Sequence, residues 1–209
     1  MKKLIVIFSF ILVNTSFAQL SISFSAGVDP KEISLYDHSA IDGDNAYWKN
    51  GISIGANIDY SISEKFLISA LFHYSHYSFD KYSNTGLSIP EISFLYAEGE
   101  SSKLWRTSIE AKYFPFPQNR FKFFVLSGLG IAVVDLGTIK THYSNMFRSG
   151  NQTYIIDSKI KNSFVHSLGL GVRTTIISNL FIDIFGSYYS NYNERFQTFF
   201  GLNLGYQVL

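Results

Sequence analysis

The stretch Phe196-Gln-Thr-Phe-Phe-Gly-Leu-Asn-Leu-Gly-Tyr-Gln-Val208 alternates between two kinds of side chain. One set, mostly apolar, stands at every second position: Phe196, Thr198, Phe200, Leu202, Leu204, Tyr206 and Val208. The positions between them hold Gln197, Phe199, Gly201, Asn203, Gly205 and Gln207. A period of two is that of a β-strand whose two faces meet different environments. The stretch therefore predicts a strand with one apolar face and one largely polar face.

Similar stretches recur along the chain, and we predict eight strands, at residues 20–28, 51–61, 66–78, 104–114, 121–134, 163–177, 180–189 and 195–208. Their connections alternate in length. Residues 29–50, 79–103 and 135–162 are long and polar, residues 62–65, 115–120 and 178–179 are short turns, and 190–194 is a hairpin on the long-loop side. Long loops at one end and tight turns at the other are typical of bacterial outer-membrane barrels, whose short turns are periplasmic.

The fold class we predict is all-β, an eight-stranded antiparallel up-and-down transmembrane β-barrel. In the second predicted strand, Ile52, Ile54 and Ile58 alternate with Ser53, Asn57 and Asp59. A bilayer offers no water to polar groups, so the apolar set is expected to face lipid and the polar set the lumen. A soluble lipocalin-like barrel would have the reverse polarity, and alternation by itself does not label the two faces.

The first 18 residues have the pattern of a secretory signal peptide. Lys2 and Lys3 precede an apolar run at 4–13, and Ser16-Phe17-Ala18 supplies small residues at the positions that a signal peptidase reads. We therefore divide the chain into a signal peptide at 1–18 and a barrel domain at 19–209. The apolar run is shorter than a transmembrane helix requires. An exported barrel of this polarity is expected in the outer membrane of a Gram-negative bacterium.

Composition narrows the function classes. The chain of 209 residues carries a net charge of +1, which becomes −1 when the two lysines of the signal peptide are removed. There is no basic excess for nucleic acid. Cysteine is absent from the sequence, which excludes disulfides and thiol chemistry. No spacing of histidines and acids predicts a metal site, and we expect no cofactor. Aromatic residues are expected to form two interfacial girdles, the lower of them from Tyr60, Phe66, Tyr113, Phe114, Phe116 and Phe121.

Six charged residues fall on the predicted lumen face: Asp59, Glu110, Lys112, Lys122, Arg173 and Asp183. Three acids balance three bases, which favours a polar network that fills the barrel. An ion or substrate path is the alternative. Eight strands leave an interior that side chains fill, so we expect a plug rather than a pore. Leu67, Leu71, Phe124 and Leu126 fall on the same face and interrupt its polar pattern.

The segment Phe199-Phe-Gly-Leu-Asn-Leu-Gly-Tyr206 resembles the closing strand of the small outer-membrane β-barrel (porin-like, OmpA/OmpX-like) superfamily, and Ser127-Gly-Leu-Gly130 is similar to its mid-barrel glycine strand. The resemblance implies contact with outer-membrane lipids and with the barrel-insertion machinery. That family usually ends on an aromatic residue, whereas this chain ends Val208-Leu209. The alternation, the signal peptide and the loop asymmetry predict a non-enzymatic barrel with a role in envelope structure, or in binding an extracellular ligand through the long loops.

One motif raises an enzymatic alternative. His142-Tyr-Ser-Asn145 resembles the His-x-Ser-Asn motif of outer-membrane lipid A deacylases. The resemblance implies that His142 is the base and Ser144 the nucleophile, with Asp157 as the nearby acid. In that family the motif lies on a late strand that faces lipid, and the acid is a glutamate. Here the motif falls in the connection after the fifth predicted strand. A narrow channel or small-ligand barrel is the third alternative.

Overall fold

The computed structural model describes residues 19–30, 48–80, 92–145, 151–191 and 196–208. Eleven strands lie in these ranges: β1 (Gln19–Asp29), β2 (Gly51–Ser61), β3 (Phe66–Tyr77), β4 (Ile92–Gly99), β5 (Ser102–Tyr113), β6 (Phe121–Leu136), β7 (Ile139–Asn145), β8 (Asn151–Ile156), β9 (Lys159–Ile177), β10 (Leu180–Asn191) and β11 (Phe196–Gln207). The proposed signal peptide at 1–18 lies outside the described residues. None of the described residues forms a helix long and apolar enough to cross a membrane.

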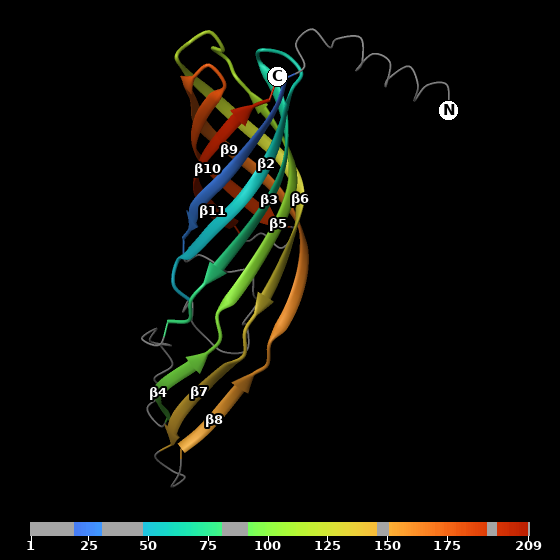
Figure 1. The fold of residues 1–209 in the computed structure, drawn as a ribbon. Coiled ribbons are helices and arrows are strands. Elements are labelled where there is room, and N and C mark those ends of the chain that lie inside the picture. The colour runs from blue at the N-terminus through green and yellow to red at the C-terminus, as the bar shows by residue number, and fades with distance from the viewer. Residues whose placement is uncertain (1–18, 31–47, 81–91, 146–150, 192–195, 209) are drawn as a thin grey trace, which may run out of the picture.

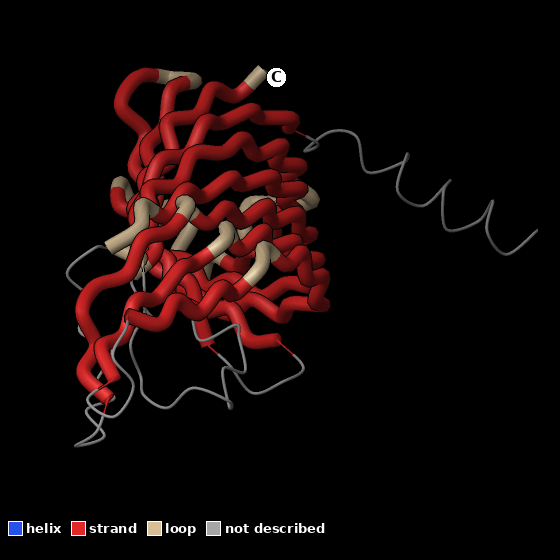
Figure 2. Tube along the Cα trace, turned by 90° about the horizontal axis from the view of Figure 1, so that it is seen from below, coloured by secondary structure: helices blue, strands red, loops and turns tan. Residues whose placement is uncertain are grey.

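Eight of these strands close into a barrel in the order β1-β11-β10-β9-β6-β5-β3-β2, with β2 paired back to β1. Every contact in the ring is antiparallel, and each strand pairs with its neighbours along the barrel (Figure 1). The wall consists almost wholly of strand (Figure 2). This confirms the predicted eight-stranded up-and-down barrel. Closure matters physically because it leaves no unpaired sheet edge in the membrane.

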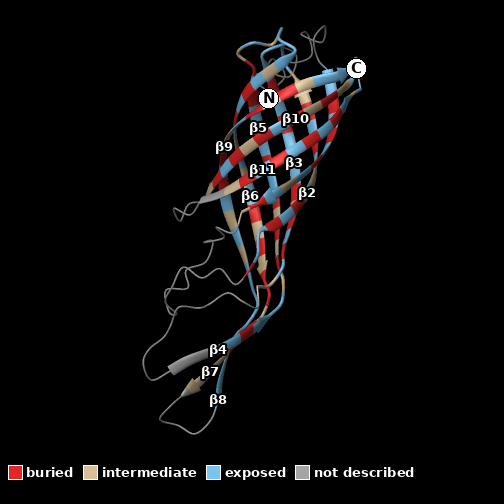
Figure 3. Cartoon of the chain, turned by 90° about the vertical axis from the view of Figure 1, so that its left-hand side faces the viewer, coloured by how far each residue is buried: buried red, intermediate tan, exposed pale blue. Residues whose placement is uncertain are grey.

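The two faces of the wall have the predicted polarity. Ser53, Asn57 and Asp59 are buried inside, whereas Ile52 and Ile58 are exposed on the outside. The same alternation of buried and exposed positions runs along the other barrel strands (Figure 3). An outer surface of Ile, Leu, Val and Phe cannot face water over eight strands, so the barrel has the polarity of a transmembrane protein and not of a lipocalin.

Large apolar side chains share the lumen with the polar ones. Phe124, Phe185 and Phe199 are buried inside, and the rings of Phe185 and Phe199 lie 5.5 Å apart between centroids. Phe114 also points inward and packs on Phe124 at 5.4 Å, so its assignment to the lower girdle is wrong. The inward aromatics need room: a Cβ on Gly201 would meet the rings of Phe199 and Phe185. Glycines on the lumen face therefore let a narrow barrel hold these rings.

Two of the predicted polar loops are wrong in part, because they contain strands. The strand β4 lies within 79–103, and β7 and β8 lie within 135–162. They form a separate antiparallel sheet in the order β4-β7-β8, which lies beyond the long-loop end of the barrel (Figure 1). Sequences such as Tyr154-Ile-Ile156 favour strands. The pairing of β4 with β7 joins residues forty or more positions apart, and local patterns do not show it.

The sheet continues one wall of the barrel. Strands β4, β7 and β8 are chain neighbours of β5, β6 and β9, and the two sets are ordered alike. At the junction, the Glu100 amide donates to the Thr138 carbonyl and the Thr138 amide donates to the Glu100 carboxylate, each at 3.0 Å. The buried Trp48 indole donates to the Glu100 carbonyl at 3.0 Å. These bonds fix the base of the sheet on the barrel rim.

Candidate functional site

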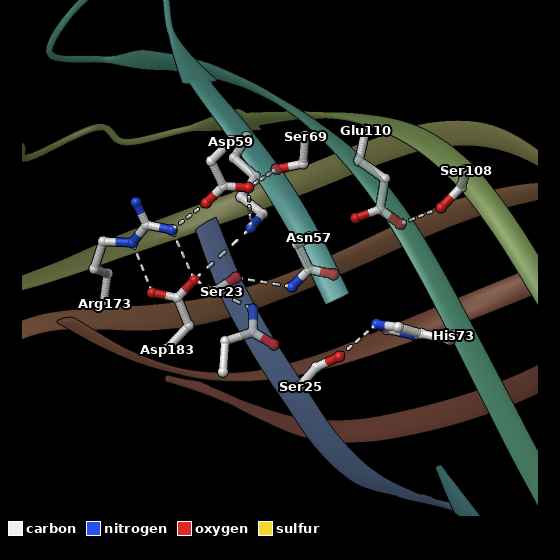
Figure 4. A network of polar contacts seen from close by, with 12 residues as sticks. Ser23, Ser25, Asn57, Asp59, Ser69, His73, Ser108, Glu110, Arg173 and Asp183 are labelled. Carbon is white, nitrogen blue, oxygen red and sulfur yellow. Dashed lines mark hydrogen bonds and ion pairs between the residues drawn. The ribbon is translucent and has the colours of Figure 1, made fainter. Parts of the chain in front are cut away.

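The lumen of the short-turn half is crossed by an ion-pair network centred on Arg173 of β9. Its Nε lies 2.6 Å from Asp183 Oδ1, and its Nη2 lies 2.8 Å from both Asp183 Oδ2 and Asp59 Oδ2. Asp183 lies directly across from Arg173 in the β9–β10 register, whereas Asp59 lies on β2, across the lumen (Figure 4). The two acids are buried to 1% exposure or less. A guanidinium that donates to two carboxylates ties opposite walls together.

Lys112 of β5 completes the network from a third direction. Its Nζ lies 3.7 Å from a carboxylate oxygen of Asp59 and of Asp183. The Ser69 hydroxyl donates to Asp59 at 2.6 Å. The Arg173 guanidinium also lies over the ring of Phe181, with Cζ 3.9 Å from its centroid. The structure thus brings together four of the six predicted lumen charges: Asp59, Lys112, Arg173 and Asp183.

The other two predicted charges lie apart from this network. Glu110 is buried one layer further into the barrel, where Tyr189 donates to its carboxylate at 3.5 Å. Lys122 is half-buried and lines a cavity of about 660 Å³ that opens at the short-turn end. Among the described residues, no ion pair joins Lys122 or Glu110 to the network. The cavity reaches Arg173 and Phe181, where the network closes it.

A second buried ion pair lies toward the long-loop end, and sequence reasoning missed it. Arg106 Nη2 lies 3.3 Å from Asp29 Oδ1, Ser75 donates to the same carboxylate, and the Arg106 Cζ lies 3.8 Å from the centroid of the Tyr189 ring. Extending the first predicted strand by one residue places Asp29 in step with Ser25 and Gly27 on the lumen face. Arg106 shares the face of Glu110 and Lys112. The alternation therefore places both Asp29 and Arg106 on the lumen face.

The lumen is therefore blocked in successive layers. Arg173 and its acids close the short-turn half, Glu110 and Tyr189 follow, and Arg106 with Asp29 lies beyond them. Phe199 packs against His73 between these layers, with ring centroids 5.1 Å apart. Each buried charge in the two ion-pair clusters has its counter-charge, which removes the main cost of burying it. Such an interior, filled by side chains, is expected of an eight-stranded barrel.

The extramembrane sheet presents a different surface. On its exposed face the rings of Tyr96 on β4 and His142 on β7 stack with centroids 4.3 Å apart. His142 Nδ1 is hydrogen-bonded to Thr153 Oγ1 on β8 at 3.0 Å. The β4–β7–β8 register places Glu98, Lys140 and Ile155 in the next row, while Ala97 and Thr141 are buried on the other face. The exposed face combines aromatic, hydrogen-bonding and charged groups on a paired scaffold.

The motif residues His142, Ser144 and Asp157 lie on or beside this sheet. His142 and Ser144 occupy alternate positions of β7, and Asp157 is exposed just after β8. None of the hydrogen bonds among the described residues joins His142 to Ser144 or to Asp157; the Nδ1 of His142 is held by Thr153 instead. The described residues contain no group of three or more His, Asp or Glu side chains arranged to hold a metal.

Comparison with known proteins gives a fold and no closer relationship. No family model and no curated protein matches the chain. Among solved structures, the chain is similar to Ail, the attachment invasion locus protein of Yersinia pestis, in complex with the heparin analogue sucrose octasulfate: 19% identity, 91% of this chain and 99% of that chain covered, TM-score 0.51. It is also similar to Neisserial surface protein A, with 14% identity, 91% and 97% covered, and TM-score 0.49. The likeness to Ail shows a shared small outer-membrane barrel fold.

Proposed function

We propose that this outer-membrane barrel is a non-enzymatic surface protein that binds an extracellular ligand on the exposed face of β4, β7 and β8. The observation that carries the proposal is the sheet itself, which continues the barrel wall beyond the membrane and presents to solvent the Tyr96 ring, stacked on the half-buried His142. Aromatic side chains on a rigid scaffold give large contact area at low conformational cost. The blocked lumen supports a role for the barrel as an anchor.

The first ligands to test are glycans, sulfated ones included. Ail, which shares this fold at 19% identity, was solved with a heparin analogue. The sheet region of the present chain offers Lys140 and Lys159, and also Glu98 and Asp157. This mixed charge favours recognition through stacking and hydrogen bonds over a purely electrostatic attraction to a polyanion. Binding is therefore expected to depend only weakly on salt.

The test is binding of the purified, detergent-solubilised protein to immobilised heparin, uncharged glycans and extracellular-matrix proteins. The double variant Tyr96→Ser/His142→Ser removes the stack, and we expect it to reduce binding at least tenfold. Lys65→Ser, in an exposed short turn at the other end of the barrel, is the matched control and should bind as wild type. Equal binding by the wild type and the double variant would contradict the proposal.

The position of the His142 motif supports the non-enzymatic role over the deacylase alternative. Its strand, β7, stands beyond the barrel rim (Figure 1) and not on the band that faces acyl chains. A hydrolase of membrane lipid needs its nucleophile beside the ester or amide it cleaves. We expect Ser144→Ala to leave the mass spectrum of lipid A unchanged when wild type and variant are expressed in the same host. A lipid A species lacking one acyl chain only in the wild type would restore the deacylase hypothesis.

A further inference from the structure

The outer, lipid-facing surface contains a hydrogen-bonded polar pair between two barrel strands. Ser127 of β6 and His166 of β9 both point outward, and Ser127 Oγ lies 3.3 Å from His166 Nε2. Their neighbours on the same face are apolar: Leu129 follows Ser127 on β6, and Leu168 follows His166 on β9. Polar side chains in contact with hydrocarbon carry a free-energy cost, so a polar pair at this position suggests a role in binding.

A groove of about 460 Å³ lies beside the pair on the outer wall. Residues of β6, β9 and β10 line it, among them Leu129, Ile131, Phe164, His166 and Ser190. In the register, His166 lies opposite Leu129 on one side and opposite Ser190 on the other. Phe164 and Leu129, at 77% and 70% exposure, form its most exposed walls. The groove is thus mostly apolar, with His166 in its lining and Ser127 hydrogen-bonded to His166.

The groove lies toward the long-loop edge of the apolar band. From the short-turn end, the outward side chains of β9 are Ile176, Thr174, Val172, Leu170 and Leu168, then His166 and Phe164, and then the polar Asn162, followed by Ile160. Ser190 is the last residue but one of β10 and lies two positions beyond Tyr188. Because the long loops are extracellular in such barrels, this edge meets the outer leaflet where acyl chains join their headgroups.

The pair always has one donor hydrogen to spare. If His166 carries its proton on Nδ1, Ser127 donates to Nε2 and the Nδ1–H remains. If the proton is on Nε2, His166 donates to Ser127 and the hydroxyl hydrogen remains. Among the described residues, no other side-chain hydrogen bond engages Ser127 or His166. In a bilayer, the acceptors at this depth are the carbonyl oxygens that link acyl chains to a lipid.

We propose that this groove binds one acyl chain of an outer-leaflet lipid, whose ester or amide carbonyl accepts a hydrogen bond from the Ser127–His166 pair. The apolar walls match a hydrocarbon chain and the spare donor matches its carbonyl. The site binds lipid and does not cleave it, since no carboxylate among the residues lining the groove orients His166 as a base. It is independent of the ligand-binding sheet, since the two surfaces share no residue.

The test is native mass spectrometry of the whole protein, released from detergent after titration with a single phospholipid. The probes are a diester phosphatidylethanolamine and its diether analogue, which keeps the phosphate and chains but lacks carbonyls. We expect one diester molecule to be retained, and the diether about tenfold more weakly, since one hydrogen bond out of water is lost. Ser127→Ala and His166→Leu should each abolish the preference for the diester.

Two further variants make the result decisive. Ser190→Phe should fill the groove and remove retention of both lipids, whereas Thr174→Val removes an outward hydroxyl near the short-turn end of β9 and should behave as wild type. Folding of each variant is checked by its faster migration in SDS without boiling. Equal retention of diester and diether, loss of the diester preference in Thr174→Val, release of fatty acid, or a protein dimer covering the groove would each overturn the proposal.

Discussion

The sheet of β4, β7 and β8 continues three of the eight strands that enclose the barrel lumen, yet different forces hold the two regions. Within the membrane, β5, β6 and β9 belong to a closed ring whose inward side chains meet buried partners from every direction. Beyond the rim, β4, β7 and β8 form an open sheet of three strands, held at its base by Trp48, Glu100 and Thr138. The difference teaches that closure fixes register and burial, whereas the sheet depends on a few local contacts and leaves one face exposed.

The largest loss of stability is expected for Arg173→Met. The substitution removes the guanidinium and leaves Asp59 and Asp183 buried with Lys112 as their remaining cation. Breaking a buried ion pair by removing one partner costs about 3–5 kcal/mol. Urea unfolding of the reconstituted barrel measures the free energy of unfolding. Lys122→Met, at the half-buried cavity mouth, is the control, and a loss as large as that of Arg173→Met would contradict the central role of the network.

A smaller difference separates two neighbouring phenylalanines on opposite faces of β11. Phe199→Ala empties part of the lumen, where the walls are fixed, while Phe200→Ala leaves a space that acyl chains fill. Both variants lose apolar transfer free energy, so the expected difference is the cavity term, about 2 kcal/mol greater loss for Phe199→Ala. The same urea titration measures both, and equal losses would mean that the lumen relaxes around a cavity as readily as lipid does.

Gly137→Val should destabilise the sheet of β4, β7 and β8 and leave the barrel stable. A Cβ at Gly137 would meet Glu100, whose backbone and carboxylate anchor the junction. Overpacking costs about 1–3 kcal/mol, and we expect the loss to be confined to β4, β7 and β8. Hydrogen exchange of backbone amides, resolved by peptide, should show faster exchange in 139–145 and unchanged exchange in β11. Ser158→Val, at the exposed β8–β9 junction, is the control; barrel-wide loss of protection would show that the two regions unfold together.

The smallest effect is expected for Thr153→Val, which removes the hydrogen bond to His142 on the exposed face. A hydrogen bond of this kind contributes about 0.5–1 kcal/mol. Its loss should lower the stability of the sheet and not that of the barrel. Amide exchange rates in β7 should rise severalfold, while Thr153→Ser keeps the hydroxyl and should resemble wild type. Unchanged rates in Thr153→Val would mean that the stack with Tyr96 alone orients the imidazole.

Much of the lumen could be predicted because its residues follow the alternation. Asp59, Lys112, Arg173 and Asp183 each stand in step with neighbours on their own strand, so the shared lumen face follows from sequence. The sequence does not show which of these charges pair with one another, because Asp59 and Arg173 are 114 residues apart and meet only across the closed barrel. Asp29 was missed because it ends its strand. Phe114 was misplaced because it was grouped with the aromatics beside the short turns, although the alternation puts it in step with Lys112 on the lumen face.

The sequence by itself determined the environment of this protein: a two-residue period repeated over eight strands demands a wall between a polar and an apolar medium. Only the tertiary structure decided which charges neutralise one another, that β4, β7 and β8 pair into a sheet, and that Ser127 and His166 meet beside a groove. Alternation is a property of one strand and can be read locally. Pairing across the lumen and between distant loops depends on closure of the whole ring, which no single segment records.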